Sequence, residues 1–382
     1  MKVVYVIDSL ASKGGAERIL SEKMNYMVSR FGYEVYVVTC YQDVAHDQNA
    51  YPLSEKVIQV NLNIPYYSQY HVHYPMRLWV KYRLYQRLRR DLTAAVHRID
   101  PDVLVGLGYF NADLVTGIKC RARKVVESHE ARIFTMSDKG LSRSFLSRLF
   151  MRYYKKCYFR SVERQVDVVV TLTNGDAKEW QFAHRIEVIP NFTIMEVSRP
   201  STCEAKRVIA VGRLEWQKGF DRLIDAWQIV ETRHSDWQLS IYGSGTLKDA
   251  LVHQIQKLGL QKVSLHPFTP FIAEAYAESS VFVQSSRFEG FGLVLIEAMK
   301  AGLPCVTFDC PYGPSDVVVD GECGYVLPNG DIRQLAERLC SLIEDPQLRI
   351  RFSQAALART QVFDVDVVMQ RWRELFEGLC LQ

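Results

Sequence analysis

Residues 285–299 read SSRFEGFGLVLIEAM, and this stretch decides how the rest of the chain is interpreted. It follows the apolar run 281–283, which is typical of a buried strand, and apolar residues recur at helical spacing from Leu293 onward. The predicted order is therefore strand, tight loop and helix start. Gly290 and Gly292 allow the backbone to approach a ligand closely. The helix start offers unpaired N–H groups to a phosphate.

Two glutamates flank this helix start: Glu289 lies in the loop and Glu297 lies in the helix. A carboxylate repels phosphate, but it accepts hydrogen bonds from hydroxyl groups. The pattern therefore predicts a ligand with phosphate in its middle and a polyol at each end, which describes a nucleotide diphosphate sugar. The plainer interpretation is a helix with two solvated glutamates that follows a glycine turn.

The length and composition indicate a soluble protein of two domains. The chain has 382 residues, of which 48% are hydrophobic and 24% are charged. No apolar run reaches the roughly 18 to 20 residues of a membrane span, and the sequence opens on a strand rather than on a signal peptide. The nine cysteines are scattered without a C-x-x-C pair, so we expect reduced, mostly buried thiols in a cytoplasmic protein.

Strand and helix patterns alternate along the chain, which is typical of parallel sheets covered by helices. The predicted strands are 2–8, 34–40, 57–62, 102–107, 124–128, 166–172, 207–212, 238–243, 263–267, 281–285 and 304–308. The predicted helices include 16–30, 77–98, 142–164, 219–232, 245–258 and 331–343. The polar, aperiodic segment 192–206 predicts a linker.

We therefore predict the α/β class with two facing Rossmann-like domains. The N-terminal domain is expected to span 1–195 and the C-terminal domain 196–362, with a helix in 363–382 that packs back on the N-terminal domain. In such sheets ligands bind beyond the carboxyl ends of the strands, and the cleft between two facing domains is the expected active site.

A second loop at a predicted strand end carries cations. Residues 211–219 read VGRLEWQKG and follow the first strand of the C-terminal domain. Arg213 can grip phosphate oxygens with two N–H groups, and Lys218 supplies a point charge. Together they can neutralise a diphosphate and stabilise it as a leaving group without a metal ion. The alternative is a pair of solvated loop charges.

Three further turns follow predicted strands. One carries Gly14 and Gly15 at a helix start, and another is the segment 242–245, which reads YGSG. Each can line a ligand site or be an ordinary turn. His129 follows the strand 124–128, where its imidazole could donate to a sugar hydroxyl or face the charge that develops at the reacting carbon. A structural histidine is the alternative.

Other kinds of site have little support in the sequence. Asp364 and Asp366 form a D-x-D triplet, but they lie in a helical C-terminal segment, where a helix N-cap or a solvated pair is expected. The motifs G-x-G-x-x-G and H-E-x-x-H, the P-loop lysine and a Ser-His-Asp arrangement are not found. We therefore predict no metal ion and no cofactor, and we do not expect a dinucleotide-dependent dehydrogenase.

Taken together, these motifs resemble the GT4-type retaining glycosyltransferases of the GT-B fold. The most specific part is the pair Glu289 and Glu297, which are separated by seven residues. Residues 298–304 follow directly and read AMKAGLP. The supporting parts are Gly14, Gly15, Arg213, Lys218 and the segments 189–191 and 328–331. The likeness therefore runs through most of the chain.

The resemblance implies how a nucleotide sugar would bind. Arg213 and Lys218 would hold the diphosphate, and Glu297 would bind the ribose. Glu289 would bind hydroxyls of the donor sugar, and His129 would reach the same sugar. The other residues implied in donor binding are Gly14, Gly15, Gly290, Phe291, Gly292 and Leu293.

The implied reaction is transfer of a hexosyl or N-acetylhexosaminyl group with retention at the anomeric carbon and without a divalent metal. In a front-face route the leaving diphosphate takes the acceptor's proton, so the site supplies charge stabilisation and alignment. A double displacement needs a side-chain nucleophile, and the sequence leaves that route open. The segment 309–315, DCPYGPS, resembles bacterial members that build lipid-linked glycans, which points to a UDP-sugar and to surface glycan synthesis.

The acceptor is expected at the basic N-terminal half, where residues 1–195 contain 28 Lys and Arg against 19 Asp and Glu. The stretches 64–90 and 141–164 combine aromatic and basic side chains, which suit the headgroups of an anionic membrane. We expect a glycan or polyprenyl-diphosphate-linked acceptor and peripheral attachment to the inner face of the cell membrane. The alternative is two amphipathic helices whose aromatic side chains are core. Nucleic acid is not expected, since no binding module is recognisable.

Two other functions suit the same scaffold. One is a non-catalytic protein that binds sugar nucleotides or membranes, and the other is a UDP-sugar epimerase of the GT-B fold. The intact set of Glu289, Glu297, Arg213 and Lys218 favours the transferase over the non-catalytic protein.

Overall fold

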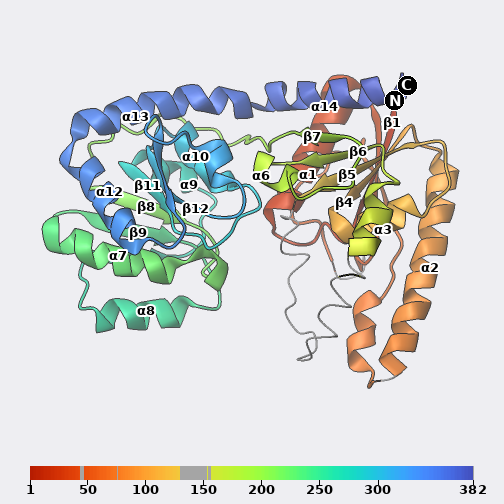
Figure 1. The fold of residues 1–382 in the computed structure, drawn as a ribbon, viewed down its shortest axis with the longest axis horizontal. Coiled ribbons are helices and arrows are strands. Elements are labelled where there is room, and N and C mark those ends of the chain that lie inside the picture. The colour runs from red at the N-terminus through yellow and green to blue at the C-terminus, as the bar shows by residue number, and fades with distance from the viewer. Residues whose placement is uncertain (44–46, 75, 130–152, 154–155, 382) are drawn as a thin grey trace. The chain divides into compact units, whose positions relative to one another are not determined.

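The chain is divided into two compact units in the computed structural model, which describes residues 1–43, 47–74, 76–129, 153 and 156–381 (Figure 1). Unit 1 consists of Met1–Leu172, Asp176–Ile189 and Met369–Gln382. Unit 2 consists of Thr173–Gly175 and Pro190–Val368.

Unit 1 is built on a parallel sheet with the strand order β3-β2-β1-β4-β5-β6-β7. Its strands are β1 (Lys2–Ile7), β2 (Glu34–Thr39), β3 (Ile58–Asn61), β4 (Val103–Leu107), β5 (Arg123–Ser128), β6 (Val168–Thr171) and β7 (Ile186–Val188). Its helices include α1 (Gly15–Tyr26), the π-helix η1 (Met27–Phe31), the 3-10 helix η2 (Tyr66–His71), α2 (Met76–Ile99), α3 (Gly108–Thr116) and α6 (Asn174–Ala177), which begins in unit 2. The chain reverses its direction of winding between β1 and β4, which makes the carboxyl ends of these strands the expected ligand-binding edge.

Unit 2 repeats this design with the strand order β10-β9-β8-β11-β12-β13. Its strands are β8 (Arg207–Val211), β9 (Gln238–Tyr242), β10 (Val263–His266), β11 (Val281–Gln284), β12 (Cys305–Asp309) and β13 (Gly324–Pro328). Its helices include η3 (Trp216–Lys218), α7 (Phe220–Arg233), α8 (Lys248–Lys257), α9 (Ile272–Ala277), α10 (Leu293–Lys300), α11 (Pro314–Val317), α12 (Ile332–Glu344), α13 (Pro346–Arg359) and η4 (Thr360–Phe363). Here the winding reverses between β8 and β11.

The strands of both units form because their sequences are short apolar runs that a sheet covered on both faces can bury. Every residue of β11 is buried, as is every residue of β4. Side chains cap the starts of α12 and α13: the carboxylate of Asp331 accepts from the backbone nitrogen of Gln334 at 2.9 Å, and Asp345 accepts from Leu348 at 2.9 Å. The apolar runs could be recognised in the sequence.

The structure confirms the strands predicted from the sequence, with ends shifted by one or two residues. The short edge strands β7 and β13 were not predicted, nor were α3 and α13. The predicted helix 142–164 lies largely outside the described residues, among which 156–163 are helical.

The segment 192–206, predicted as a linker, carries no helix or strand, although it packs firmly on unit 2. The backbone nitrogen of Ser201 donates to the carbonyl of Ala301 at 2.8 Å. The side chain of Arg349 donates to the carbonyl of Cys203 at 3.1 Å. These contacts explain why this polar segment is ordered against the core that follows it.

The helix α14 (Val365–Cys380) belongs to unit 1 from Met369 onward. It buries Trp372, Phe376 and Leu379, and the hydroxyl of Tyr33 donates to Glu377 at 3.1 Å. Unit 1 is therefore completed by residues that lie far along the chain from its other parts.

Six of the nine cysteines are buried and all nine are free thiols, as predicted. Asp364 precedes α14 and accepts from the backbone nitrogen of Asp366 at 2.9 Å, which is the predicted capping role. In the part of the chain that the structure describes, no helix combines the length and apolar character needed to cross a bilayer.

Candidate functional site

Four loops of unit 2 meet at one edge of its sheet because parallel strands place their carboxyl ends together. These loops follow β8, β9, β11 and β12, and β8 pairs directly with β11 at the reversal of winding. The loops that carry Lys218 and Glu289 therefore leave neighbouring strands. The sequence predicted both loops at strand ends, and the structure brings them into contact.

Glu289 is the centre of this edge. Its side chain is 6% exposed, and its Oε1 atom accepts three hydrogen bonds. The donors are Nζ of Lys218 at 2.7 Å, Nε2 of Gln284 at 2.7 Å and Oγ of Ser286 at 2.5 Å. All three donors converge on one oxygen, so the carboxylate is held in a fixed orientation while Oε2 keeps its capacity to accept from a ligand.

The backbone of Glu289 is fixed by the loop after β12. The Glu289 nitrogen donates to the carbonyl of Pro311 at 3.0 Å, and the nitrogen of Tyr312 donates to the Glu289 carbonyl at 2.9 Å. This segment is part of the stretch 309–315 that the sequence singled out. Its role in unit 2 is to hold the acidic loop from the side opposite to Lys218's loop, since β11 lies between β8 and β12 in the sheet.

Lys218 is positioned by a tight turn that only glycine fits. It ends η3, and Gly219 follows with φ +64°. A Cβ atom at Gly219 would overlap the carbonyl oxygen of Ser285, whose hydroxyl in turn donates to the Lys218 carbonyl at 3.1 Å. The cationic loop and the acidic loop therefore interlock through their backbones.

Arg213, the second predicted cation, is exposed at the start of the same loop. Its Nη2 donates to Oε1 of Gln217 at 3.3 Å. Glu215 ties this loop to the loop after β9, since it accepts from the nitrogen and the hydroxyl of Thr246 at 2.9 and 2.8 Å. The hydrogen bonds from Thr246 lower the pKa of the Glu215 carboxyl, so this tie is made by an anion at neutral pH.

The start of α10 lies directly after the Glu289 loop. Gly292 is its N-cap residue with φ +91° and no side-chain cap, so no side chain of the cap residue occupies the first amides of the helix. Phe291 is buried against Phe363, with ring centroids 6.0 Å apart, so it can offer a ligand only its backbone. Glu297 is the fifth residue of α10 and is 7% exposed.

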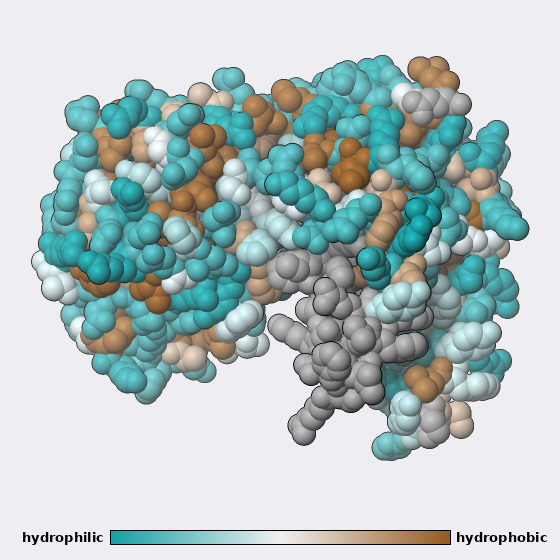
Figure 2. All heavy atoms as spheres, viewed as in Figure 1, coloured by the Kyte–Doolittle hydropathy of each residue, from teal (hydrophilic) through white to brown (hydrophobic). Residues whose placement is uncertain are grey.

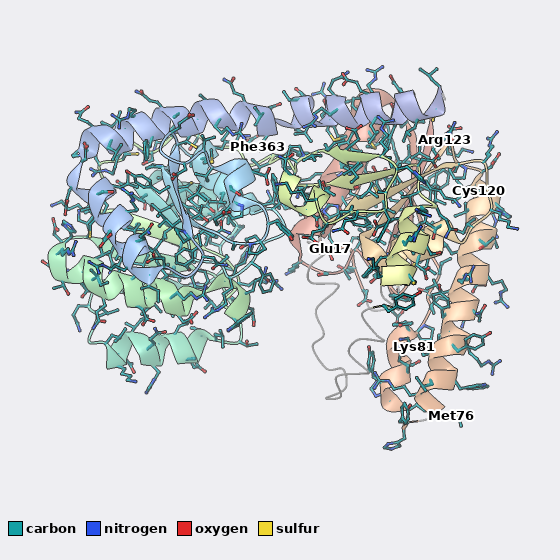
Figure 3. The ribbon with its side chains drawn as sticks, viewed as in Figure 1. Glu17, Met76, Lys81, Cys120, Arg123 and Phe363 are labelled. Carbon is teal, nitrogen blue, oxygen red and sulfur yellow. The ribbon has the colours of Figure 1, made fainter. Side chains whose placement is uncertain are left out.

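The predicted glycine turn of unit 1 is also a helix start. Gly14 is the N-cap residue of α1 and Gly15 is its first residue. Glu17 lies in the first turn of this helix (Figure 3), where a carboxylate is favourable for the helix dipole. Gly15 is exposed.

His129 follows β5 in unit 1 and is 6% exposed at its side chain. Its Nε2 lies 3.0 Å from Oε1 of Glu127, and Glu127 is also bonded to Nζ of Lys23. Burial acts to raise the pKa of Glu127, but its interactions with Lys23 and His129 outweigh burial and hold it at about 2. Sequence reasoning identified His129 but missed its partner Glu127 and the ion pair of Glu127 with Lys23. Lys23 lies in an amphipathic helix, where a lysine is expected to face solvent.

Within unit 2 the structure thus unites Lys218, Glu289 and the start of α10, and it adds residues that the sequence did not suggest. Gln284 and Ser286 donate to Glu289, and the sequence analysis did not identify them. Their position at the end of β11 and at the start of the loop was the signal in the sequence that could have indicated this role. Among the described residues no cluster of three or more His, Cys, Asp or Glu side chains could hold a metal ion.

Comparison with known proteins agrees with the motifs. Residues 196–359 match the family model described as "Glycosyl transferases group 1". A Haemophilus influenzae protein described as an "Uncharacterized glycosyltransferase" is 30% identical over 213 residues, which cover 54% of this chain and 60% of that protein. The "Amylovoran biosynthesis glycosyltransferase AmsD" of Erwinia amylovora is 37% identical over 171 residues, which cover 44% of this chain and 47% of AmsD. The matched regions thus span about half to three fifths of these relatives.

The fold is shared with solved glycosyltransferase structures over nearly the whole chain. Sucrose-phosphate synthase from Thermosynechococcus elongatus superposes with a TM-score of 0.78 at 17% identity, covering 99% of this chain and 98% of that one. Anabaena HepE, solved in complex with UDP and glucose, superposes with a TM-score of 0.72 at 19% identity, covering 99% and 100%. The chain therefore has the GT-B fold that its sequence predicted.

Proposed function

We propose that this protein is a retaining glycosyltransferase that moves a hexosyl or N-acetylhexosaminyl group from a nucleoside diphosphate to a glycan acceptor. One observation carries the proposal: Lys218 holds the carboxylate of Glu289 at 2.7 Å directly before the uncapped start of α10. A cation, an acceptor oxygen and the first backbone amides of a helix then lie in one part of unit 2, which suits a sugar joined to a diphosphate.

The proposed roles follow from the donors and acceptors that each group keeps. Lys218 and Arg213 neutralise the diphosphate, and the amides at the start of α10 bind its distal phosphate. Glu289 presents Oε2 to hydroxyls of the donor sugar, since Oε1 is held by three protein donors. Glu297 is assigned to the ribose, and in unit 1 the resemblance assigns Gly15 to the diphosphate and His129 to the sugar.

Retention by a front-face route is the mechanism that this set of groups favours. The leaving diphosphate needs positive charge at the moment of bond breaking, and Lys218 with the α10 amides supplies it in a partly desolvated place. Oε1 of Glu289 is occupied by Lys218, Gln284 and Ser286, which makes this carboxylate an acceptor of hydroxyls rather than an attacking nucleophile. The diphosphate then serves as the base for the acceptor hydroxyl.

We propose UDP as the nucleotide and surface glycan synthesis as the setting. Anabaena HepE shares the fold and was solved with UDP and glucose, and AmsD is named for amylovoran biosynthesis. These two names support the proposal.

The test is an assay of the purified protein with a panel of UDP-hexoses and UDP-N-acetylhexosamines, with and without polyprenyl-diphosphate-linked acceptors, in buffer with EDTA. We expect UDP release that depends on the acceptor, an α-linked product from an α-linked donor, and a rate unchanged by EDTA, because the protein's own cations replace a metal. An inverted product or a rate abolished by EDTA would contradict the mechanism. An interconverted UDP-sugar would identify an epimerase instead.

We also propose that a lipid-linked acceptor is met at the surface of an anionic membrane. Residues 64–90 contain six Lys and Arg and no Asp or Glu. None of the described residues 76–87 is buried, and Trp79 and Tyr82 are 54% and 62% exposed. Met76 and Lys81 mark this protruding end of α2 in Figure 3, and pale and brown residues gather there in Figure 2. Basic and aromatic side chains together suit a headgroup layer.

Flotation with vesicles tests this surface. We expect the protein to float with phosphatidylglycerol vesicles at low salt and not with phosphatidylcholine vesicles. The pair Trp79→Ser and Tyr82→Ser is expected to lower the bound fraction at least about tenfold, because each ring buried in the interface contributes roughly 1.5 kcal/mol or more. The matched control is Phe268→Ser with Phe271→Ser, two rings of unit 2 that are 74% and 68% exposed, and it should float like the parent. Absence of the protein from anionic vesicles at low salt would end this proposal.

A further inference from the structure

A fully buried ion pair lies behind His129 in unit 1. Lys23 of α1 and Glu127 of β5 each have side chains that are 1% exposed, and Nζ of Lys23 contacts both carboxylate oxygens of Glu127. Placing two charges in a core is costly, and apolar residues of similar size often serve stability as well or better. Stability alone is therefore a weak explanation for this pair.

The pair is enclosed by aromatic rings from two other elements. Nζ of Lys23 lies 3.9 Å from the centroid of the Trp372 ring in α14 and 5.2 Å from the centroid of the Tyr5 ring in β1. The hydroxyl of Tyr5 donates to the sulfur of Met27. The ammonium group is thus confined between a carboxylate and aromatic faces, which leaves Glu127 little freedom to rotate.

His129 is a neighbour of this pair that lies just beyond the carboxyl end of β5. Oε1 of Glu127 is 3.0 Å from Nε2 of His129, although the ring N–H is not aimed along that line. The contact is therefore mainly electrostatic. A carboxylate at this distance favours a proton on Nε2, and the other ring nitrogen is then left to meet a ligand.

We propose that Glu127 is a positioning residue, which is held by Lys23 and Trp372 and keeps the proton of His129 on Nε2 so that Nδ1 faces the donor sugar. This proposal rests on the proposed role of His129 in sugar binding. It adds three residues that act through the histidine: a carboxylate, a buried ammonium and an indole from the far end of the chain. Glu127 determines which nitrogen of His129 carries the proton. Lys23 and Trp372 fix the position of the Glu127 carboxylate.

The first experiment is a double-mutant cycle on kcat. Glu127→Gln alone would leave Lys23 buried without a counter-charge, so it is combined with Lys23→Met. We expect the combined variant to lower kcat about 10- to 100-fold, which is the loss typical of removing a carboxylate behind a metal-binding histidine. The KM for the donor is expected to change less than about threefold. In the background of His129→Ala, the same pair of changes is expected to cost nothing further, because residues that act through one group are not additive.

A purely structural role gives a different result. The losses would then be the same with and without His129, and they would follow the fall in thermal stability. Either that outcome or an unchanged kcat in the combined variant overturns the proposal. Glu127→Asp is a second variant in case the first fails to fold: it keeps the charge beside Lys23 and withdraws it from the ring, so an intermediate loss of kcat is expected.

A spectroscopic measurement tests the proposal independently of transferase activity. Nitrogen-15 labelling of the histidines, with His129→Ala to assign the signal, reports which ring nitrogen carries the proton. We expect the Nε2–H form in the parent and a mixture in the Lys23→Met, Glu127→Gln variant. A parent with the proton on Nδ1 overturns the inference even if the protein proves to be a transferase. The expected tautomers without transfer activity would instead point to a failure of the proposed function.

The chain offers a matched control for both measurements. His234 and Glu344 of unit 2 also lie 3.0 Å apart through Nε2 and Oε1, but Glu344 is 60% exposed. Glu344→Gln is therefore expected to leave kcat within about twofold, because solvent screens an exposed pair. A loss in this control as large as the loss in the Glu127 variant would show that the assay reports general damage.

Discussion

Replacing Glu289 by glutamine is expected to lower kcat about 10²- to 10³-fold, or about 3 to 4 kcal/mol of transition-state stabilisation. The glutamine carbonyl takes the place of Oε1, because Lys218, Gln284 and Ser286 all donate to that position. Its NH₂ group then stands where Oε2 stood. A sugar hydroxyl that donated to the carboxylate meets a donor instead, and the negative charge near the reacting sugar is lost.

The measurement is steady-state kcat for UDP release with the best donor and acceptor of the panel, together with the Kd for UDP alone. We expect the Kd for UDP to stay within about threefold, because Glu289 is assigned to the sugar and not to the nucleotide. The control is Glu278→Gln, an exposed glutamate paired with Arg207 beside the opposite end of the strands, which should keep its rate. Near-normal turnover of the Glu289 variant removes this residue from the site.

The second large effect is expected from Lys218→Met, which keeps the length of the side chain and removes its charge. We expect kcat to fall about 10²-fold, because the leaving diphosphate loses its nearest cation. Unlike the Glu289 variant, this variant should also bind UDP more weakly, with a Kd raised about tenfold or more. The reason is that a charge-assisted contact to phosphate is lost in a partly buried place. The folded state should persist, because Glu289 keeps Gln284 and Ser286 as donors.

Comparing the two variants separates the assigned roles. Lys206→Met serves as the control for charge: Lys206 pairs with Asp236 at the surface and precedes β8, at the other end of the strand from Lys218. It should retain both turnover and UDP affinity. If Lys218→Met binds UDP as tightly as the parent, the lysine serves only to hold Glu289 and the diphosphate must be bound elsewhere.

The fold could be predicted largely because its strands are short apolar runs that alternate with amphipathic helices. The run at β11 and the helical spacing from Leu293 gave the strand, loop and helix start of the site directly. The edge strands β7 and β13 escaped prediction for a physical reason. They cover three and five residues and are only partly buried, so their sequences lack a continuous apolar signal.

The site could be predicted only as far as single loops. Glu289 and Lys218 were assigned to loops at strand ends, but nothing in the sequence shows that they bond to each other, because their contact depends on β8 and β11 being neighbours. The hydrogen bond from the Glu289 nitrogen to the Pro311 carbonyl likewise depends on β12 lying beside β11. Buried charges such as Lys23 could not be predicted for another reason: a lysine in a helix normally indicates a solvent-exposed position.

The place of α14 in unit 1 bears on how the protein matures during synthesis. The ribosome delivers residues 1–189 first, yet the buried side chains of Trp372, Phe376 and Leu379 belong to the same compact unit. Nascent unit 1 must therefore wait, with an apolar face and the ammonium of Lys23 unshielded, while the whole of unit 2 is translated. The later unit can finish its own sheet first, so the order of folding can run opposite to the order of translation.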